Sequence, residues 1–402
     1  MPDLVLPELG SLPAYVYDLG GLTAHTARIR SAVKGTELLY AAKANPDPNL
    51  LRAIAPHVDG FEVASGGELA HVRETVPGAR IFFGGPGKTD AELAAALDLG
   101  VERVHVESPH ELRRLAAVAG GRFADVLLRA NLDVPVPGAS LTMGGEATPF
   151  GMDPAGLSEC LSVLHEAPWL RLRGVHVHLA SGLAAPEMLA LTESVLAWVR
   201  PWLRACALRP VELNLGGGMA VNYADPADRF DWVTYGEALA ALREPEETFR
   251  VEPGRAVAAY YGWYVTRVLD VKVSHGETFA VLTGGTHHLR TPVTKGHDQP
   301  FSIVPAPGGP SPADRAPSPV PVLSGGPRLP GLPAPVPVAY DRPVTLVGQL
   351  CTPKDVFARR VRVERIAVDD LVVFSMAGAY AWNISHHDFL MHPKPEFHYL
   401  PA

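Results

Sequence analysis

The chain has 402 residues, enough for a large domain with a smaller one, and its 47% hydrophobic and 19% charged content is typical of a soluble globular protein. A net charge of -8 argues against a nucleic-acid or anionic-membrane partner. No apolar run is long enough to cross a bilayer, and no secretory signal pattern opens the chain. Three cysteines form neither an even disulfide framework nor a zinc-spaced cluster, so we expect a cytoplasmic protein.

Short apolar stretches alternate with amphipathic ones through the first two-thirds of the chain. We predict strands over 37–44, 60–65, 79–85, 103–108, 125–132, 172–180, 211–218 and 248–255. Helical patterns such as 68–75 and 109–119 lie between most of them. This alternation predicts an α/β fold with a parallel sheet, and eight strands in about 220 residues predict a TIM-like (β/α)8 barrel over 31–262. An open doubly wound sheet is the alternative.

The pattern changes from Tyr260 onward. Strand-like runs follow at 265–273, 278–282, 345–348, 360–366 and 371–374, without helices between them. They predict a C-terminal antiparallel β-barrel domain over 263–402. Residues 1–30 are expected to supply a helix and a strand near 14–17 that joins this β domain. The proline-rich stretch 304–343 is expected to form a surface insertion of polyproline II character that does not pair as a strand.

Lys43 ends the first predicted barrel strand, in a chain with few lysines. A buried ammonium must be paired or neutralised, and a desolvated lysine suits Schiff-base chemistry. The alternative is a lysine whose amine reaches solvent. Functional side chains of such barrels stand at the carboxyl ends of strands. The chemically active residues at these ends are Lys43, Glu62, Arg129, His178, Ser181, Gly216, Gly217, Gly218, Glu252 and Arg255.

The glycine triplet 216–218 would let backbone N–H groups approach a phosphate, with Arg255 as a second contact, although a tight turn explains it equally well. Glu252 is either a functional carboxylate or a structural ion-pair partner. His176 and His178 share a strand face, which permits a metal site, but no third ligand is evident nearby and we predict no metal. The stretch 84–89 ends like a nucleotide-binding loop, but Phe82 stands where that motif requires glycine.

An amine, an anion cradle and a carboxylate together suit pyridoxal phosphate. The lysine would hold its aldehyde, the glycines its phosphate and the carboxylate its pyridine nitrogen. A carboxylate on that nitrogen keeps it protonated, so the ring can stabilise a carbanion.

Several motifs resemble the fold-type III pyridoxal-phosphate decarboxylases, the diaminopimelate/ornithine decarboxylase family. They are YAAKAN (40–45), GFEVASGGEL (60–69), HLASG (178–182), LNLGGG (213–218), EPGR (252–255), GQLCTPKDVFA (348–358) and AGAY (377–380). The stretches 83–90, 347–359 and 384–397 are similar to the siderophore-biosynthetic branch, which acts on citryl-diaminopropionate. The resemblance implies an alanine racemase-like fold type III with an eight-stranded barrel and a β domain.

The same resemblance implies roles for individual residues. Lys43 would form the Schiff base, His178 would stack on the cofactor ring and Glu252 would bind its nitrogen. Phosphate contacts would come from Ser181, the 216–218 turn, Arg255 and Tyr380, and Glu62, Arg129 and Gly254 complete the cofactor set. Relatives are usually homodimers with shared active sites, so Cys351 of a neighbouring subunit would return a proton to Cα. From the residues alone, a cysteine in such an apolar-flanked loop is usually just a small buried side chain, and only the resemblance makes Cys351 a catalytic candidate.

The substrate is expected to be a carboxylate-rich amino acid. Thr352 stands where relatives acting on simple diamino acids usually place an acidic residue, and Arg290 suits a carboxylate. Asp355 would orient its loop or face the substrate, and His386 and His387 either line the pocket or are solvated. We therefore expect α-decarboxylation of a citryl-diaminopropionate-like compound. A decarboxylase for diaminopimelate or another basic amino acid, a racemase, which Glu252 disfavours, and a non-enzymatic cofactor-binding protein are the alternatives.

Overall fold

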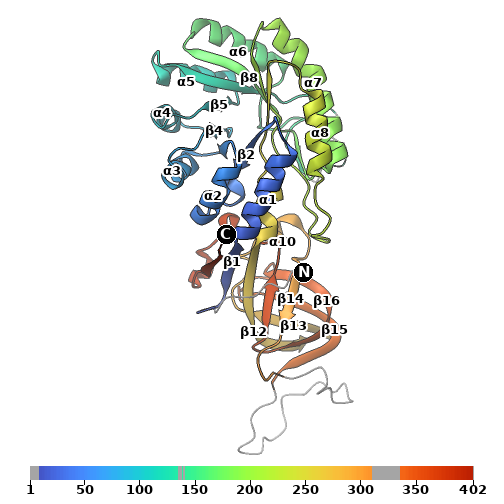
Figure 1. The fold of residues 1–402 in the computed structure, drawn as a ribbon. Helices are drawn as coiled ribbons and strands as arrows, with labels where there is room; N and C mark the ends of the chain where they lie inside the picture. Colours follow the sequence, from blue (N-terminus) through green and yellow to red (C-terminus); the bar gives the residue numbers. More distant parts are fainter. Residues whose placement is uncertain (1–8, 135–137, 139–140, 310–335, 402) are drawn as a thin grey trace, which may run out of the picture. The chain divides into compact units, whose positions relative to one another are not determined.

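Two units make up the chain in the computed structural model, which describes residues 9–134, 138, 141–309 and 336–401 (Figure 1). The barrel unit takes residues 18–261, and the β unit takes 9–17 and 262–400. Strand β1 therefore belongs to the β unit, whereas helix α1, which follows it directly, belongs to the barrel unit. Within the described part of the chain, every helix is too short or too polar to span a lipid bilayer.

Eight parallel strands close into a barrel in the order β10-β11-β2-β3-β4-β5-β6-β8. Their bounds are Glu37–Ala41 (β2), Gly60–Val63 (β3), Ile81–Phe83 (β4), Arg103–Val106 (β5), Ala124–Arg129 (β6), Leu170–His176 (β8), Val211–Asn214 (β10) and Glu247–Val251 (β11). All eight predicted strands are present, and closure excludes the open doubly wound sheet. In β3 and β4 every residue is buried, as expected for parallel strands covered on both faces.

Helices connect these strands and surround them in Figure 1. They are α1 (Leu19–Ala32), α2 (Pro48–Ile54), α3 (Gly66–Thr75), α4 (Asp90–Asp98), α5 (Pro109–Ala119), α6 (Pro154–Glu166), α7 (Ala185–Ala205) and α8 (Trp232–Leu242). Local sequence fixes where many of them begin. Thr89 caps α4 in a reciprocal capping box with Glu92, and Ser108 and Asp153 cap α5 and α6, each followed by a proline at a first-turn position.

The β unit is an eight-stranded sheet with the main order β14-β17-β12-β13-β15-β16, to which β1 and β18 are added through β12. The bounds are Ala14–Asp18 (β1), Gly262–Ser274 (β12), Glu277–Leu282 (β13), Phe301–Val304 (β14), Val338–Val347 (β15), Val356–Ala367 (β16), Leu371–Phe374 (β17) and Glu396–Leu400 (β18). The predicted pairing of the 14–17 strand with the β domain is confirmed, because β1 lies antiparallel to β12. The sheet is nearly closed, since the Gln299 N–H donates to the Phe357 carbonyl of β16 just before β14 begins.

Two expectations for the β unit need correction. The sheet is mixed, because β13 and β15 pair in parallel. The proline-rich insertion also ends earlier than predicted, since β15 begins at Val338 and Pro343 lies opposite Arg362 of β16. Pro343 is tolerated because β13 pairs with β15 only from Val344 onward, so at Pro343 the other side of β15 is an edge. Residues 310–335 of the expected insertion lie outside the described residues.

Candidate active site

Lys43 lies in a single 3-10 turn, Ala42–Ala44, directly after β2. Its Nζ is 2.6 Å from Oε2 of Glu62, which stands in the neighbouring strand β3. The two partners differ in exposure: the lysine side chain is 41% exposed, whereas that of Glu62 is 5% exposed. Burial raises the pKa of Glu62, and the charge of Lys43 only partly opposes this effect. Lys43 is therefore an amine that is paired with a buried carboxylate while its own side chain remains accessible.

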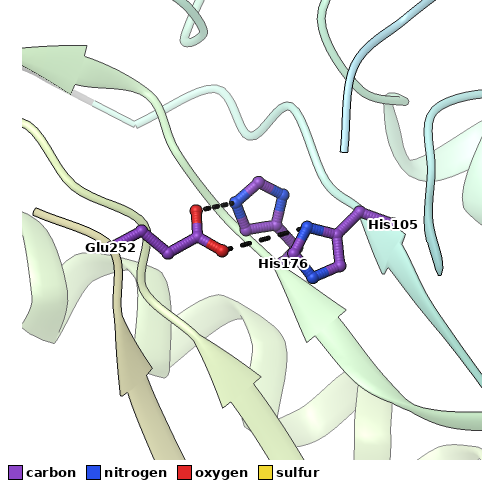
Figure 2. Close-up of side chains that lie close together, drawn as sticks. All are labelled: His105, His176 and Glu252. Carbon is purple, nitrogen blue, oxygen red and sulfur yellow. Dashed lines mark hydrogen bonds and ion pairs between the residues drawn. The ribbon is translucent and has the colours of Figure 1, made fainter. Parts of the chain in front are cut away.

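Glu252 follows β11 and is buried among polar side chains from other strands. Asn214 of β10 donates to its Oε1 at 2.6 Å, and His176 of β8 lies with Nε2 3.2 Å from its Oε2. His105 of β5 approaches the same carboxylate from 3.9 Å (Figure 2). The interpretation of Glu252 as a structural ion-pair residue is not favoured, because no lysine or arginine forms a salt bridge with it among the described residues.

His178 lies against the glycine turn that follows β10. Its Nδ1 accepts a hydrogen bond from the Gly217 N–H at 3.1 Å. A Cβ on Gly216 would come within 2.7 Å of the imidazole, so only glycine permits this approach. Burial lowers the pKa of His178 well below its usual value, with Arg129 and Lys43 acting in the same direction. The ring is therefore a neutral, fixed surface.

The glycine turn is built differently from a simple phosphate loop. The N–H of Gly216 donates to Asn214 and that of Gly217 to His178, whereas the Gly218 N–H makes no hydrogen bond within the described residues. Gly218 has a φ of +102° and could not carry a side chain, because a Cβ there would overlap the carbonyl oxygen of Ala180. Of the three N–H groups, only that of Gly218 is left to meet an anion.

The other predicted phosphate residues of the barrel unit come from nearby elements. Ser181 lies in the short strand β9 (Ala180–Ser181), and the Gly218 carbonyl accepts the N–H of Gly182. Arg255 begins helix α9 (Arg255–Ala258), and its Nη1 donates to the Tyr223 hydroxyl at 2.8 Å. A Cβ on Gly254 would lie 2.7 Å from that of Ala44, so glycine lets this segment pack on the Lys43 turn.

Arg129 and Lys88 belong to a buried charge network. Arg129 donates to Glu107 at 2.6 Å and covers the Phe150 ring, while Lys88 donates to Glu111 at 2.7 Å and to two carbonyls. The Lys88 side chain is only 1% exposed, and burial lowers its pKa. Lys88 is therefore a buried structural residue with saturated donors, whereas the Lys43 side chain is 41% exposed. The predicted cofactor contact of Arg129 remains a prediction.

Cys351 lies in a loop of the β unit, residues 348–355. It is the exposed member of the three cysteines; Cys160 is buried, and burial raises its pKa to about 12. Asp355 is 2% exposed and accepts the backbone N–H groups of Leu350 and Thr286. This favours the prediction that Asp355 orients the loop over the prediction that it faces substrate.

Arg290 precedes helix α10 (Thr291–Lys295), and its guanidinium has no salt bridge or hydrogen bond within the described ranges 9–134, 138, 141–309 and 336–401. Partial burial lowers the pKa of His386, and the positive charge of Arg290 acts in the same direction. His387 stacks on Trp382 with ring centroids 3.5 Å apart. The Tyr380 carbonyl accepts from Thr291. Arg290 is thus a cation available to a carboxylate.

The sequence analysis missed His105 and Asn214 and assigned no role to His176 beyond a possible metal ligand. A usable signal was present. Polar residues recur two positions apart in β5 (Arg103, His105) and β10 (Glu212, Asn214), and such residues share a strand face. In apolar barrel strands, that spacing indicates polar layers inside the barrel.

The barrel unit brings together an exposed amine, a buried carboxylate, a neutral imidazole and a glycine turn with an unused N–H. This donor set fits pyridoxal phosphate: an amine for its aldehyde, a carboxylate for its ring nitrogen and a donor for its phosphate. Each of these groups comes from the carboxyl end of a barrel strand, where such barrels act.

Comparison with solved structures supports the architecture. The chain superimposes on diaminopimelate decarboxylase from Helicobacter pylori complexed with L-lysine with a TM-score of 0.81, covering 97% of this chain and 92% of that one. At 22% identity, this likeness shows the fold alone, a barrel with a mixed β sheet of the alanine racemase-like type.

Sequence relatives are more specific. The chain is 40% identical over 395 residues to 2-[(L-alanin-3-ylcarbamoyl)methyl]-2-hydroxybutanedioate decarboxylase from Staphylococcus aureus, covering 96% of this chain and 93% of the relative. It is 33% identical to a diaminopimelate decarboxylase from Actinosynnema pretiosum, covering 94% and 82%. Residues 19–259 match the family model described as pyridoxal-dependent decarboxylase, pyridoxal binding domain. The chain therefore belongs to the pyridoxal-dependent decarboxylases and is a carboxy-lyase that uses pyridoxal phosphate.

Proposed function

We propose that the enzyme removes the α-carboxylate of a carboxylate-rich amino acid resembling citryl-diaminopropionate, a siderophore precursor. The single observation that carries the reaction is the half-exposed Lys43 amine held at 2.6 Å by the buried Glu62. The substrate class rests on the 40% identical Staphylococcus aureus relative. The molecule in its name joins an alanine-type amino acid through an amide to a hydroxybutanedioate, which carries two further carboxylates.

In this proposal the barrel unit holds the cofactor. Pyridoxal phosphate supplies an electron-withdrawing ring that stabilises the electron pair left when a carboxylate departs. Lys43 provides the amine for its aldehyde, and Glu62 orients that amine. Glu252 would accept a hydrogen bond from the protonated ring nitrogen, while the neutral His178 ring would pack on the cofactor face. Ser181, the Gly218 N–H and Arg255 form the barrel unit's part of the proposed phosphate site. Gly216 and Gly217 shape its turn, Gly254 allows close packing on the Lys43 turn, and Tyr380 remains a further predicted contact.

Cys351 is the proposed donor that returns a proton to Cα. Its exposure supports this role, because a donor must reach the reacting carbon, and the Asp355 hydrogen bonds hold its loop in one conformation. Cys160 is buried and is not a competing candidate.

Arg290 is the proposed site for a distal carboxylate of the substrate. Its guanidinium is free of acidic partners among the described residues, and a guanidinium binds a carboxylate through two parallel hydrogen bonds. Thr352, one residue after Cys351, supplies no charge that would select a distal ammonium group. His386, whose pKa is lowered by partial burial and by the charge of Arg290, is proposed with His387 to complete this side of the substrate site.

The test measures carbon dioxide release and product mass with citryl-diaminopropionate and with diaminopimelate, the substrate named for several relatives. We expect turnover of the citryl compound with the loss of one carboxyl group. The Arg290→Lys variant should raise KM for that compound roughly 10- to 100-fold, because a charged hydrogen-bonded contact is worth about 1.5–3 kcal/mol. Turnover of diaminopimelate alone would contradict the proposed substrate and favour the alternative of a diaminopimelate decarboxylase.

We also propose a homodimer in the cytoplasm. The dimer rests on the family resemblance, in which two subunits complete each active site. Sedimentation at micromolar concentration tests it, and a monomer with full activity would contradict shared sites.

A further inference from the structure

The buried imidazoles of His105 and His176 both lie next to the Glu252 carboxylate (Figure 2). His105 and His176 stack with ring centroids 4.3 Å apart and planes 25° from parallel. Only one of their four ring nitrogens, Nε2 of His176, has a hydrogen-bond partner among the described residues, and that partner is Glu252 at 3.2 Å. Buried polar groups without partners are unusual, so this arrangement calls for an explanation.

A metal ion does not explain it, although His105, His176 and Glu252 place ligand atoms within 4.8 Å of one another. A metal lies in the plane of each imidazole that binds it, at about 2.0–2.1 Å for zinc. Two nearly parallel rings with centroids 4.3 Å apart direct their lone pairs side by side, not toward one point. In addition, one oxygen of Glu252 already accepts from Asn214 at 2.6 Å.

We propose that His176, backed by His105, is a positioning residue that fixes the Glu252 carboxylate for the cofactor's ring nitrogen. The inference rests on the proposed role of Glu252. His176 donates its Nε2–H to one carboxylate oxygen, and Asn214 donates to the other. These two donors leave lone pairs on both oxygens, so the carboxylate can accept a third hydrogen bond from a protonated pyridine.

The chemistry of His176 suits a donor without charge. Burial lowers its pKa well below the usual value, and Arg129, Lys43 and Lys88 act in the same direction. The pKa of His105 is also lowered, first by burial and then by His176. A neutral imidazole donates to Glu252 without neutralising it as an arginine would. The negative charge then remains available to hold the ring nitrogen in its protonated form.

His105 acts through His176 by packing. Its ring covers one face of the His176 imidazole and prevents rotation away from Glu252, while Phe82 packs near its own ring at a centroid distance of 6.3 Å. The role of His105 therefore depends on its flat shape and not on its nitrogens.

Four variants of the cofactor-loaded enzyme test the inference. His176→Leu removes the donor at similar size, and His176→Gln keeps an N–H donor at the position of Nε2. His105→Phe keeps a flat ring, and His105→Ala removes it. For each, the dissociation constant of pyridoxal phosphate, the pH profile of the visible absorption band of the bound cofactor and the thermal midpoint are measured, together with metal content by elemental analysis.

We expect His176→Leu to weaken cofactor binding about tenfold or more, the effect of losing one hydrogen bond to a charged group, and to shift the pH profile of the band. His176→Gln should restore both properties. His105→Phe should resemble the natural enzyme, and His105→Ala should resemble His176→Leu. Thermal midpoints separate these effects from a folding defect, because a purely structural role lowers the midpoint without moving the pH profile of the folded fraction.

Three results would overturn the inference. One is an unchanged affinity and pH profile in His176→Leu. Another is a failure of His176→Gln to restore either property in a protein that melts like the natural one. The third is stoichiometric metal in the natural enzyme that is lost in His176→Leu. A natural enzyme that does not bind pyridoxal phosphate would instead contradict the proposed function itself.

Discussion

The barrel interior contains two polar layers that use similar residues in opposite ways. In the ion-pair layer, Arg250 bonds to Glu37 and Glu212, and Arg80 and Arg103 bond to the same two carboxylates from the other side. In the active-site layer, Lys43 meets Glu62 while half exposed, and Glu252 has only neutral partners. Saturated charges stabilise a fold, whereas charges with unused capacity can bind and react.

The two layers are only two residues apart along the strands. Arg103 precedes His105, Glu212 precedes Asn214 and Arg250 precedes Glu252, each pair on one strand face. A barrel fills its interior with successive layers of side chains, so a step of two residues moves a side chain from one layer to the next. Substitutions in the two layers should therefore have separable effects.

The largest expected effect is in the active-site layer. Lys43→Arg keeps a cation beside Glu62 but removes the primary amine, so we expect no carbon dioxide release above background and no cofactor fixed by borohydride. Thermal stability should change little. The exposed Lys34→Arg serves as the control and should retain both activity and the borohydride adduct on Lys43. A full adduct in Lys43→Arg would show that another residue is the amine.

A substitution at Cys351 tests whether residues of the β unit also affect the reaction and not only stability. If Cys351 donates a proton, Cys351→Ser should lower kcat about 10²- to 10⁴-fold, the usual worth of a positioned acid. Cofactor content should stay the same, because Cys351 is not among the residues proposed to bind the cofactor. Cys206→Ser, at a half-buried cysteine, should leave kcat unchanged. Loss of cofactor in Cys351→Ser would contradict this division of roles.

The ion-pair layer should respond in stability alone. Arg250→Met leaves Glu37 and Glu212 without a shared guanidinium, and we expect a loss of about 3–5 kcal/mol in the free energy of unfolding, as for other broken buried pairs. The folded, cofactor-loaded fraction should keep its specific activity. Arg209→Met breaks the exposed pair with Glu246 and should cost roughly 0–1 kcal/mol. If urea unfolding showed the same loss of unfolding free energy in Arg250→Met and Arg209→Met, the buried layer would have no special role in stability.

The smallest expected effect is on the loss of stability at acidic pH. Partial burial would raise the pKa of Glu37 and of Glu212, but their arginine partners outweigh it, and both pKa values lie below the usual 4.5. Carboxylates with lowered pKa values stabilise the folded state above pH 4.5, and this contribution is lost as the pH falls below that value. Urea midpoints between pH 7 and 3.5 should therefore fall less steeply in Arg250→Met than in Arg209→Met. If the urea midpoints of the two variants fell equally with pH, the arginine partners would not be the cause of the lowered pKa values of Glu37 and Glu212.

Much of the fold was predictable because each barrel strand is short, apolar and bounded by turn or capping residues. The mixed sheet of the β unit was not, because the parallel pairing of β13 with β15 joins segments separated by the proline-rich stretch. Strand pairing across such a distance depends on packing and not on local pattern. Pro343 is the clearest case, since its place in β15 depends on where the neighbouring strand begins.

The candidate site divides in the same way. Lys43, His178, the glycine triplet and Glu252 follow from strand ends and motif resemblance, because parallel strands of a barrel bring their carboxyl ends together. His105 and Asn214 escaped notice, since a polar residue in a strand shows its partner only when the barrel closes. Asp355 likewise needed the structure, which shows its carboxylate accepting two backbone N–H groups.

The sequence by itself determined the barrel and the cofactor class and singled out Lys43 as the candidate amine, because strand periodicity, turn residues and ordered motifs are local properties. Only the tertiary structure decided which of the polar residues inside the barrel are saturated and which keep a free donor or acceptor. Arg250 and Glu252 are two positions apart and look alike as strand-end charges. Closure of the barrel surrounds Arg250 with carboxylates and Glu252 with neutral partners, and that difference makes Glu252, and not Arg250, the candidate functional charge.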